Sequence, residues 1–213
     1  MLTIHHLGIS QSERVVWLCE ELGIPYTLKH YVRDAVTRLA PPELRALHPA
    51  GTAPVMTDGP VQIAESGAIM QYIIAKYGNG RLALPPEHPD FAQYLYWFHF
   101  ANGNLQPHLG RTMVLNRIEA AKGHPVMASA RERVERALAM VEARLASVPW
   151  LAGQEFTAAD IMNVFTFTTM RNFSPWDLGP YPNLLAYLQR VAQRPAYQAA
   201  MAKGDPGMEL LLS

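Results

Sequence analysis

The sequence has little cysteine, no excess of charge of either sign and no long hydrophobic run. Its single cysteine, Cys19, allows no disulfide within the 213 residues. Lys and Arg number 18, as do Asp and Glu, which argues against a basic surface for nucleic acid. No apolar run suits a membrane span, and residues 1–10 do not resemble a signal peptide. We therefore expect a cytoplasmic protein that binds neither nucleic acid nor membrane.

The hydrophobic pattern divides the chain into two parts joined by a linker rich in Gly and Pro at residues 81–89. In residues 1–80, strand-like alternation and helical spacing follow one another in the order β-α-β-α-β-β-α. The expected strands cover 2–5, 26–31, 54–57 and 61–63, and the expected helices lie near 15–22, 35–47 and 66–78. The second of these helices must be interrupted or restarted at Pro41-Pro42. Residues 90–213 have helical spacing throughout. This pattern predicts an α/β N-terminal domain and an all-α C-terminal domain.

Two features stand out in the helical part. A long helix is expected from Asp90 towards Ala121, but Ala101–Asn104 includes one Gly and two Asn, which have low helix propensity. We expect a kink there, or a close approach to a ligand or a partner subunit. Further along, Thr157 and Asp160 have the spacing of a capping box, with Phe156 placed as a hydrophobic staple.

A binding site is indicated by the segment around Pro54 and the helix start at Ser66. The residue before a proline prefers an extended backbone, which leaves the N–H and C=O of Ala53 able to pair with a peptide laid alongside. The helix that starts near Ser66 offers unpaired N–H groups and a dipole that favour a carboxylate. Together these features predict a site for a small, anionic, peptide-like ligand.

This combination resembles the cytosolic glutathione transferases, and among them the bacterial type with a serine active site. In that family a residue–Pro pair with a cis bond precedes a β-hairpin, and Glu or Gln followed by Ser opens the third helix. Here the matching pairs are Ala53-Pro54 and Glu65-Ser66, and the capping-box segment and residues 190–195 match the second half. The resemblance covers the whole chain. It implies a thioredoxin-like first domain and a helical domain that contributes the hydrophobic substrate site.

The resemblance also implies a two-fold homodimer, a small electrophilic substrate, and glutathione as co-substrate with no metal. Glutathione chemistry requires a thiolate, yet a thiol with a pKa of about 8.5 is little ionised at pH 7. A hydrogen bond to the charged sulfur supplies ~1.5–3 kcal/mol and a helix N-terminus ~0.3–1 kcal/mol. One hydroxyl at a helix start is therefore about sufficient to produce the thiolate.

By resemblance Ser10, four residues before Arg14, is the thiolate-stabilising hydroxyl. Three alternatives stay open. Ser10 and Glu13 have capping-box spacing, so Ser10 could merely cap the first helix. Ser12 could take its role. A protonated His5 or His6 could attract the sulfur, although one His within the first strand and one at its end is the preferred interpretation. Cys19 lies on the apolar stripe of the helix and is expected to be a buried hydrophobe.

For glutathione itself, the resemblance assigns backbone bonds at Ala53 beside Pro54, the γ-glutamyl ammonium to Glu65 and the adjacent carboxylate to Ser66. Many relatives have Lys where this chain has Thr52, which predicts weaker binding of the glycyl carboxylate unless Arg38 or His48 compensates. The hydrophobic substrate site is expected to be lined from the helical domain by Phe98, Asn102, Met113 and Phe165.

The function that follows is a glutathione S-transferase that conjugates reduced glutathione to small hydrophobic electrophiles. A glutathione-dependent peroxidase or dehalogenase would use the same thiolate. The alternative from another class is a non-catalytic ligand-binding or protein-interaction module on the same fold, because a fold does not determine function. Joint retention of Ser10, Ala53-Pro54 and Glu65-Ser66 favours the enzyme.

Overall fold

A computed structural model describes residues 1–213 and divides the chain into two compact units. The first comprises Met1–Pro85 together with Val191–Leu210. The second comprises Pro86–Arg190 together with Leu211–Ser213.

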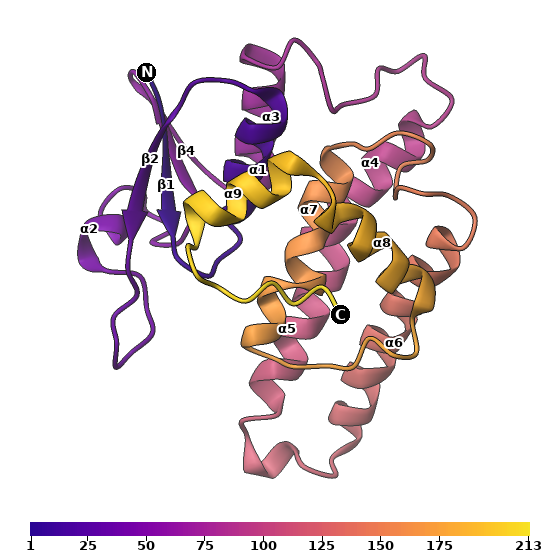
Figure 1. Cartoon of the computed structure of the whole chain (residues 1–213). Helices are drawn as coiled ribbons and strands as arrows, with labels where there is room; N and C mark the ends of the chain where they lie inside the picture. The colour runs from indigo at the N-terminus through magenta and orange to yellow at the C-terminus, as the bar shows by residue number, and fades with distance from the viewer. The chain divides into compact units, whose positions relative to one another are not determined.

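The first unit is built on a four-stranded sheet with the order β2-β1-β3-β4. Its strands are β1 (Leu2–Leu7), β2 (Thr27–Tyr31), β3 (Val55–Asp58) and β4 (Val61–Ala64). The pairs β1–β3 and β3–β4 are antiparallel, whereas β1 and β2 run parallel. Helices α1 (Glu13–Leu22) and α3 (Ser66–Lys76) lie on one face of the sheet, and the short α2 (Pro42–Arg45) lies on the other (Figure 1). This arrangement confirms the predicted thioredoxin-like fold.

The helix expected over residues 35–47 is wrong for its first part, whereas the predicted restart at Pro41-Pro42 is confirmed. Only α2 is helical, and it begins at Pro42, where the missing N–H of a proline costs nothing. Before it, Asp34 Oδ1 accepts hydrogen bonds from the backbone N–H groups of Val36 and Thr37, at 3.0 and 2.7 Å. A side chain that takes these N–H groups offers the backbone an alternative to a helix.

The C-terminal helix α9 (Pro195–Gly204) packs on α1 of the first unit. The rings of Trp17 and Tyr197 meet at 4.8 Å between centroids, and Arg194 forms two hydrogen bonds with Glu21, at 2.6 and 2.7 Å. The sequence pattern grouped this segment with the helical domain because it is helical, whereas its apolar face covers α1. As a result, Asp205, which follows α9, lies beside the loop after β1.

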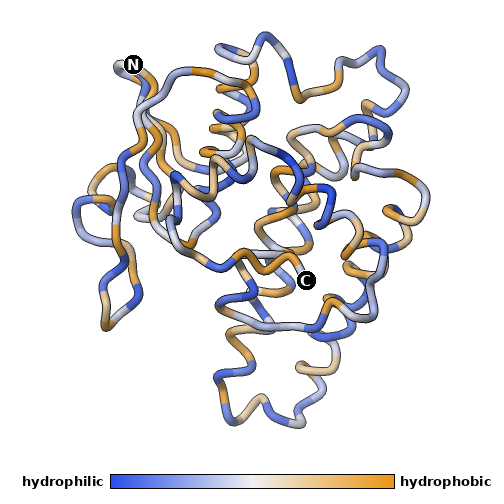
Figure 2. The backbone as a smooth tube through the Cα atoms, in the orientation of Figure 1, coloured by the Kyte–Doolittle hydropathy of each residue, from blue (hydrophilic) through white to orange (hydrophobic).

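The second unit is helical, with α4 (Phe91–Phe100), α5 (Gln106–Leu115), α6 (Pro125–Leu145), α7 (Ala158–Phe167) and α8 (Pro182–Ala192). Short 3₁₀ turns cover Glu119–Ala121 and Thr169–Asn172. In Figure 2, hydrophobic and hydrophilic colours alternate along these helices, as expected for amphipathic helices. No helix in the chain has both the length and the apolar character required to cross a membrane.

The long helix expected from Asp90 to Ala121 is not continuous. Ala101–Leu105 forms a π-helical turn between α4 and α5, at the segment where Gly and Asn suggested a kink. Asn163 on α7 donates to the Trp97 carbonyl, one turn before the π-helical segment, at 2.7 Å. π-Helical turns inside α-helices are rare and are frequently found at functional sites.

The predicted capping box at the start of α7 is confirmed. Thr157 Oγ1 accepts from the Ala159 N–H, and Asp160 Oδ2 accepts from the Thr157 N–H at 2.9 Å. Asp160 is fully buried and also accepts hydrogen bonds through Oδ1 from Leu151 N–H and Tyr187 O–H. Burial raises the pKa of this carboxyl to about 6, although these donors act in the opposite direction.

Candidate functional site

Ser10 lies in the loop between β1 and α1, and its side chain is only 6% exposed. The N-cap position of α1 is Ser12, which makes no side-chain cap hydrogen bond, so the alternative in which Ser10 caps the helix does not hold. Instead, Ser10 Oγ accepts from the Ser12 N–H at 3.2 Å and lies 2.7 Å from Ser12 Oγ. Ser10 is therefore engaged with Ser12 and not with the cap of α1.

Ser12 connects Ser10 to His6. The Ser12 Oγ lies 2.9 Å from His6 Nδ1 and accepts from the Leu7 N–H at 3.2 Å. Both Ser12 and His6 are completely buried. Three candidates for the thiolate-stabilising residue, Ser10, Ser12 and His6, thus belong to one hydrogen-bonded chain.

The two neighbouring histidines of β1 face opposite sides of the sheet, and neither lies at the end of the strand. His5 hydrogen-bonds the Tyr31 hydroxyl at 2.9 Å and Thr57 Oγ1 at 3.2 Å. Burial and, to a smaller extent, nearby Lys29 lower the pKa of His5. His6 faces Ser12, and its Nε2 lies 3.2 Å from Asp205 Oδ2, close enough for an ion pair although the alignment is poor for a hydrogen bond.

Ile9 holds a left-handed backbone conformation with φ 51°, which is rare for a β-branched residue. Its N–H donates to Asp205 Oδ1 at 2.8 Å, and its carbonyl accepts from Arg33 Nη2 at 3.1 Å. Arg33 also donates from Nε to the Gly8 carbonyl at 3.2 Å. Two side chains from other segments therefore fix the loop that carries Ser10.

Ala53 and Pro54 meet the geometry expected of a peptide-binding edge. The bond between them is cis, as predicted. Both residues are buried at the start of β3, and the Ala53 N–H and C=O take no part in the backbone hydrogen bonds of the chain. They remain available to a peptide laid alongside.

Glu65 and Ser66 form the start of α3. Glu65 is exposed at the N-cap with φ 72° and ψ 114°, a conformation that costs a non-glycine residue ~1–3 kcal/mol. Ser66 is buried, and its Oγ accepts from Arg14 Nη1 at 3.2 Å. Burial lowers the pKa of Arg14 to about 9, with Glu13 acting in the opposite direction, so the guanidinium stays charged at pH 7. The start of α3 therefore combines backbone N–H groups, a helix dipole and a nearby cation.

The comparisons with known proteins identify the family. Residues 5–81 match the model of the glutathione S-transferase N-terminal domain, and residues 90–195 match that of the C-terminal domain. Glutathione S-transferase 3 of Schizosaccharomyces pombe is 30% identical, over 100% of this chain and 92% of its own length. The chain belongs to the glutathione S-transferase family.

Two further relatives are similar over nearly the full length. The disulfide-bond oxidoreductase YfcG of Escherichia coli is 31% identical, over 98% of each chain. The crystal structure of a glutathione S-transferase from Actinobacillus pleuropneumoniae superimposes with a TM-score of 0.89 at 31% identity, covering 98% of this chain and 95% of its own.

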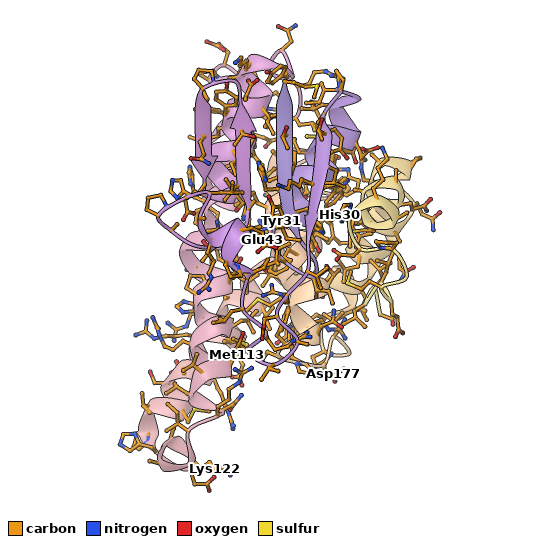
Figure 3. The ribbon with its side chains drawn as sticks, turned by 90° about the vertical axis from the view of Figure 1, so that its left-hand side faces the viewer. His30, Tyr31, Glu43, Met113, Lys122 and Asp177 are labelled. Carbon is orange, nitrogen blue, oxygen red and sulfur yellow. The ribbon has the colours of Figure 1, made fainter.

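Other residues predicted for this transferase site are less well placed. Thr52 is exposed. It follows a turn in which the Gly51 N–H donates to the His48 carbonyl at 2.8 Å, so His48 lies one turn before Thr52. Arg38 is exposed and lines a cavity of about 500 Å³ with Ile9, Arg33 and Asp205. His30 and Tyr31, which lie together at the end of β2 (Figure 3), line the same cavity.

The predicted hydrophobic residues lie on three elements of the second unit. Phe98 on α4 and Phe165 on α7 are buried at 1% and 6% exposure, which suits helix core. Asn102 in the π-helical turn and Met113 on α5 are partly exposed. Met113 lies further along the chain than Asn102, on α5 towards the end of the second unit that Lys122 marks (Figure 3). The four residues therefore do not form one compact cluster on a single helix face.

Cys19 is buried, as predicted, and burial raises the pKa of its thiol to about 12. It is unsuited to act as a nucleophile. No group of three or more His, Cys, Asp or Glu side chains could hold a metal ion. Sequence reasoning missed Asp205, Ile9 and Arg33, because each acts through backbone or side-chain contacts that only the packing of α9 and β2 creates.

Proposed function

We propose that this protein is a glutathione transferase that joins the sulfur of reduced glutathione to small hydrophobic electrophiles. The observation that carries the proposal is the position of the Ser10 hydroxyl, 2.7 Å from the Ser12 hydroxyl. The loop that carries Ser10 is held by hydrogen bonds from the Ile9 N–H to Asp205 and from Arg33 to the Ile9 carbonyl. The Ala53 backbone and the start of α3 supply polar groups of the kind that a peptide and its carboxylate require.

In this proposal the Ser10 O–H donates a hydrogen bond to the thiolate of bound glutathione. Such a bond to a charged group stabilises it by ~1.5–3 kcal/mol, equivalent to lowering the thiol pKa by about one to two units. The thiolate then attacks an electrophilic carbon. The sulfur–carbon bond forms as the leaving group departs with its electron pair. Glu65 takes the ammonium of the peptide, and Ser66 with its N–H takes the adjacent carboxylate. Asn102 and Met113 are the better exposed candidates for contact with the electrophile.

A second candidate is thiol–disulfide exchange, which the relative named disulfide-bond oxidoreductase favours. The same thiolate can attack a disulfide sulfur, forming a mixed disulfide and releasing the other sulfur as a thiolate. Because Cys19 is buried with a raised pKa, the attacking sulfur would be that of glutathione. The homodimer and the cytoplasmic location expected from the sequence remain predictions.

The test is a pair of assays, with an aryl halide and with a small dialkyl disulfide, on wild type, Ser10→Ala and Ser147→Ala. Ser147 is an exposed serine in the second unit and serves as the matched control. We expect Ser10→Ala to lower kcat/KM for the aryl halide about 10- to 100-fold, and Ser147→Ala to leave it unchanged. Activity with the disulfide alone would favour the second candidate. Binding of glutathione without turnover of either substrate would identify a non-catalytic module.

A further inference from the structure

Four side chains of the first unit form one chain of polar contacts that ends at Ser10. Asp205 Oδ2 lies 3.2 Å from His6 Nε2, His6 Nδ1 lies 2.9 Å from Ser12 Oγ, and Ser12 Oγ lies 2.7 Å from Ser10 Oγ. All four side chains are at most 7% exposed. The inference drawn from this chain rests on the proposed function, in which Ser10 donates to the thiolate.

The contact between Ser10 and Ser12 must contain one proton, because two hydroxyl oxygens at 2.7 Å repel each other otherwise. That proton belongs either to Ser10 or to Ser12. If Ser10 supplies it, Ser10 has no other proton to donate to a thiolate. Ser10 can therefore serve the sulfur only when Ser12 donates to Ser10.

The direction of the Ser12 hydroxyl depends on His6. Ser12 Oγ accepts the Leu7 N–H, and three acceptors lie within reach of its own proton: Ser10 Oγ at 2.7 Å, His6 Nδ1 at 2.9 Å and the Leu7 carbonyl at 3.3 Å. When His6 Nδ1 carries a proton and donates to Ser12, the shorter of the two remaining contacts directs the Ser12 proton to Ser10. When Nδ1 carries none, it accepts the Ser12 proton instead. The carboxylate of Asp205 favours a proton on Nε2, and a proton on both nitrogens makes His6 an imidazolium. Thiolate stabilisation by Ser10 thus goes together with protonation of the His6–Asp205 pair.

We propose that the His6–Asp205 pair takes up the proton that glutathione loses when its thiolate forms. The S–H bond breaks and its proton passes to Ser10 Oγ. The Ser10 proton passes to Ser12 Oγ, and the Ser12 proton passes to His6 Nδ1. Every hydroxyl in the chain reverses its direction, and Ser10 then donates to S⁻. No proton enters the solvent in this step, and the imidazolium lies beside the Asp205 carboxylate. After the sulfur has reacted, the stored proton leaves to water and the chain is reset.

The surroundings of His6 contain few other charged groups. On β2, His30 meets the His6 ring edge-on at 5.6 Å between centroids and is exposed. Beyond Asp205, Arg33 on the segment after β2 interacts with the Asp205 charge. At the end of α9, Gly204 leaves room for the ring. His6 and Asp205 are positioning residues in this account, because neither touches the substrate.

The test measures two quantities when reduced glutathione binds at pH 7, namely the ultraviolet absorbance of the thiolate and the protons released into a weakly buffered solution with a pH indicator. The proteins are wild type, His6→Asn, Asp205→Asn, Ser10→Ala and His5→Asn. Asparagine keeps a polar atom near the position of Nδ1 but cannot take up an additional proton near pH 7. His5 is the matched control, a buried histidine of the same strand that faces the other side of the sheet.

For wild type and His5→Asn we expect thiolate with far fewer than one proton released per thiolate. For His6→Asn and Asp205→Asn we expect at least a fivefold lower thiolate yield, with one proton released for each thiolate that remains. Release of one proton per thiolate by wild type would overturn the proposal. The proposal would also be overturned if both His6→Asn and Asp205→Asn gave the same thiolate yield and the same proton release as wild type. In that case, loss of thiolate in Ser10→Ala would still support the proposed function. Absence of thiolate in wild type would overturn both.

Discussion

Asp205 meets His6 at 3.2 Å and, through its other oxygen, accepts the Ile9 N–H at 2.8 Å. The residue that follows the last helix therefore fixes both the histidine of the first strand and the loop that carries Ser10. This contact adds to the packing of α9 on α1 within the first unit. It ties the C-terminal segment to the proposed chemistry and leads to the predictions below.

Gly204→Ala is expected to disturb His6 without unfolding the protein. An added Cβ would lie 3.3 Å from His6 Cε1 and Nε2, and the ring is held between Ser12 and Asp205. We expect kcat to fall several-fold with little change in KM for glutathione, because the peptide contacts lie elsewhere. Gly110→Ala on α5, where an added Cβ meets nothing within 4 Å, is the control for a helical Gly→Ala change. Equal kcat for the two variants would contradict the positioning role of His6.

Thr52→Lys is expected to tighten glutathione binding. Thr52 is exposed beside the cis bond of Ala53-Pro54, and its hydroxyl carries no charge to meet the glycyl carboxylate. A lysine ammonium there adds a charge-assisted hydrogen bond, and we expect a several-fold lower Kd by isothermal titration. Thr52→Met, similar in length but uncharged, should not tighten binding. An unchanged Kd in Thr52→Lys would mean that another cation, such as Arg38, already meets the carboxylate.

Glu65→Gly is expected to stabilise the fold and weaken glutathione binding. Glycine adopts positive φ without the penalty that Glu65 carries at φ 72°, so the unfolding free energy should rise by about 1 kcal/mol. Loss of the carboxylate should raise the Kd for glutathione tenfold or more. Glu65→Gln keeps the backbone penalty and loses the charge, so its Kd should rise while its denaturation midpoint stays near that of wild type. A Glu65→Gly variant that binds as well as wild type would show that the strained residue serves no ligand.

Asp160→Asn is expected to change how stability depends on pH. The pKa of Asp160 is about 6 in the folded state, whereas the ordinary pKa of an aspartate, as in the unfolded chain, is 3.8. Between these values the folded state binds more protons, so this group's contribution to the unfolding free energy decreases as the pH rises. The unfolding free energy of wild type minus that of Asp160→Asn should therefore be about 2 kcal/mol smaller at pH 7 than at pH 4.5.

Urea denaturation of both proteins at the two pH values checks this expectation. The lowered pKa of His5 has the opposite effect on stability near pH 6, but it is present in both proteins and cancels in the difference. A difference that does not vary with pH would show that Asp160 is ionised in the folded state throughout.

Local signals in the sequence predicted much of the fold. Alternation gave the strands, Gly23 ended α1 in a left-handed conformation, and the Thr157–Asp160 pair capped α7. These features depend on neighbouring residues only. The sequence did not predict the turn at Asp34, because the residues after it have helical spacing. In the structure the Asp34 side chain accepts a hydrogen bond from a backbone N–H group there and so prevents a helix. The π-helical register was also beyond reach, since Gly103 signals a weak helix without specifying how it is distorted.

The candidate site divides in the same way. Ala53, Pro54 and Ser66 could be proposed from the sequence because each belongs to a short motif with a backbone consequence. Ser12 and His6 could also be named as candidates, but Asp205 could not, because it reaches Ile9 and His6 only through the packing of α9 against α1. The spacing of residues in the sequence does not predict that contact.

The most direct test of the central claim is a pH titration of the thiolate absorbance of bound glutathione, for wild type and Ser10→Ala. The account predicts that the bound thiol of wild type titrates about one to two units below free glutathione and that Ser10→Ala restores a pKa near that of the free thiol. Equal titration of the two proteins, with a lowered pKa in both, would contradict the role of Ser10 and direct attention to Ser12.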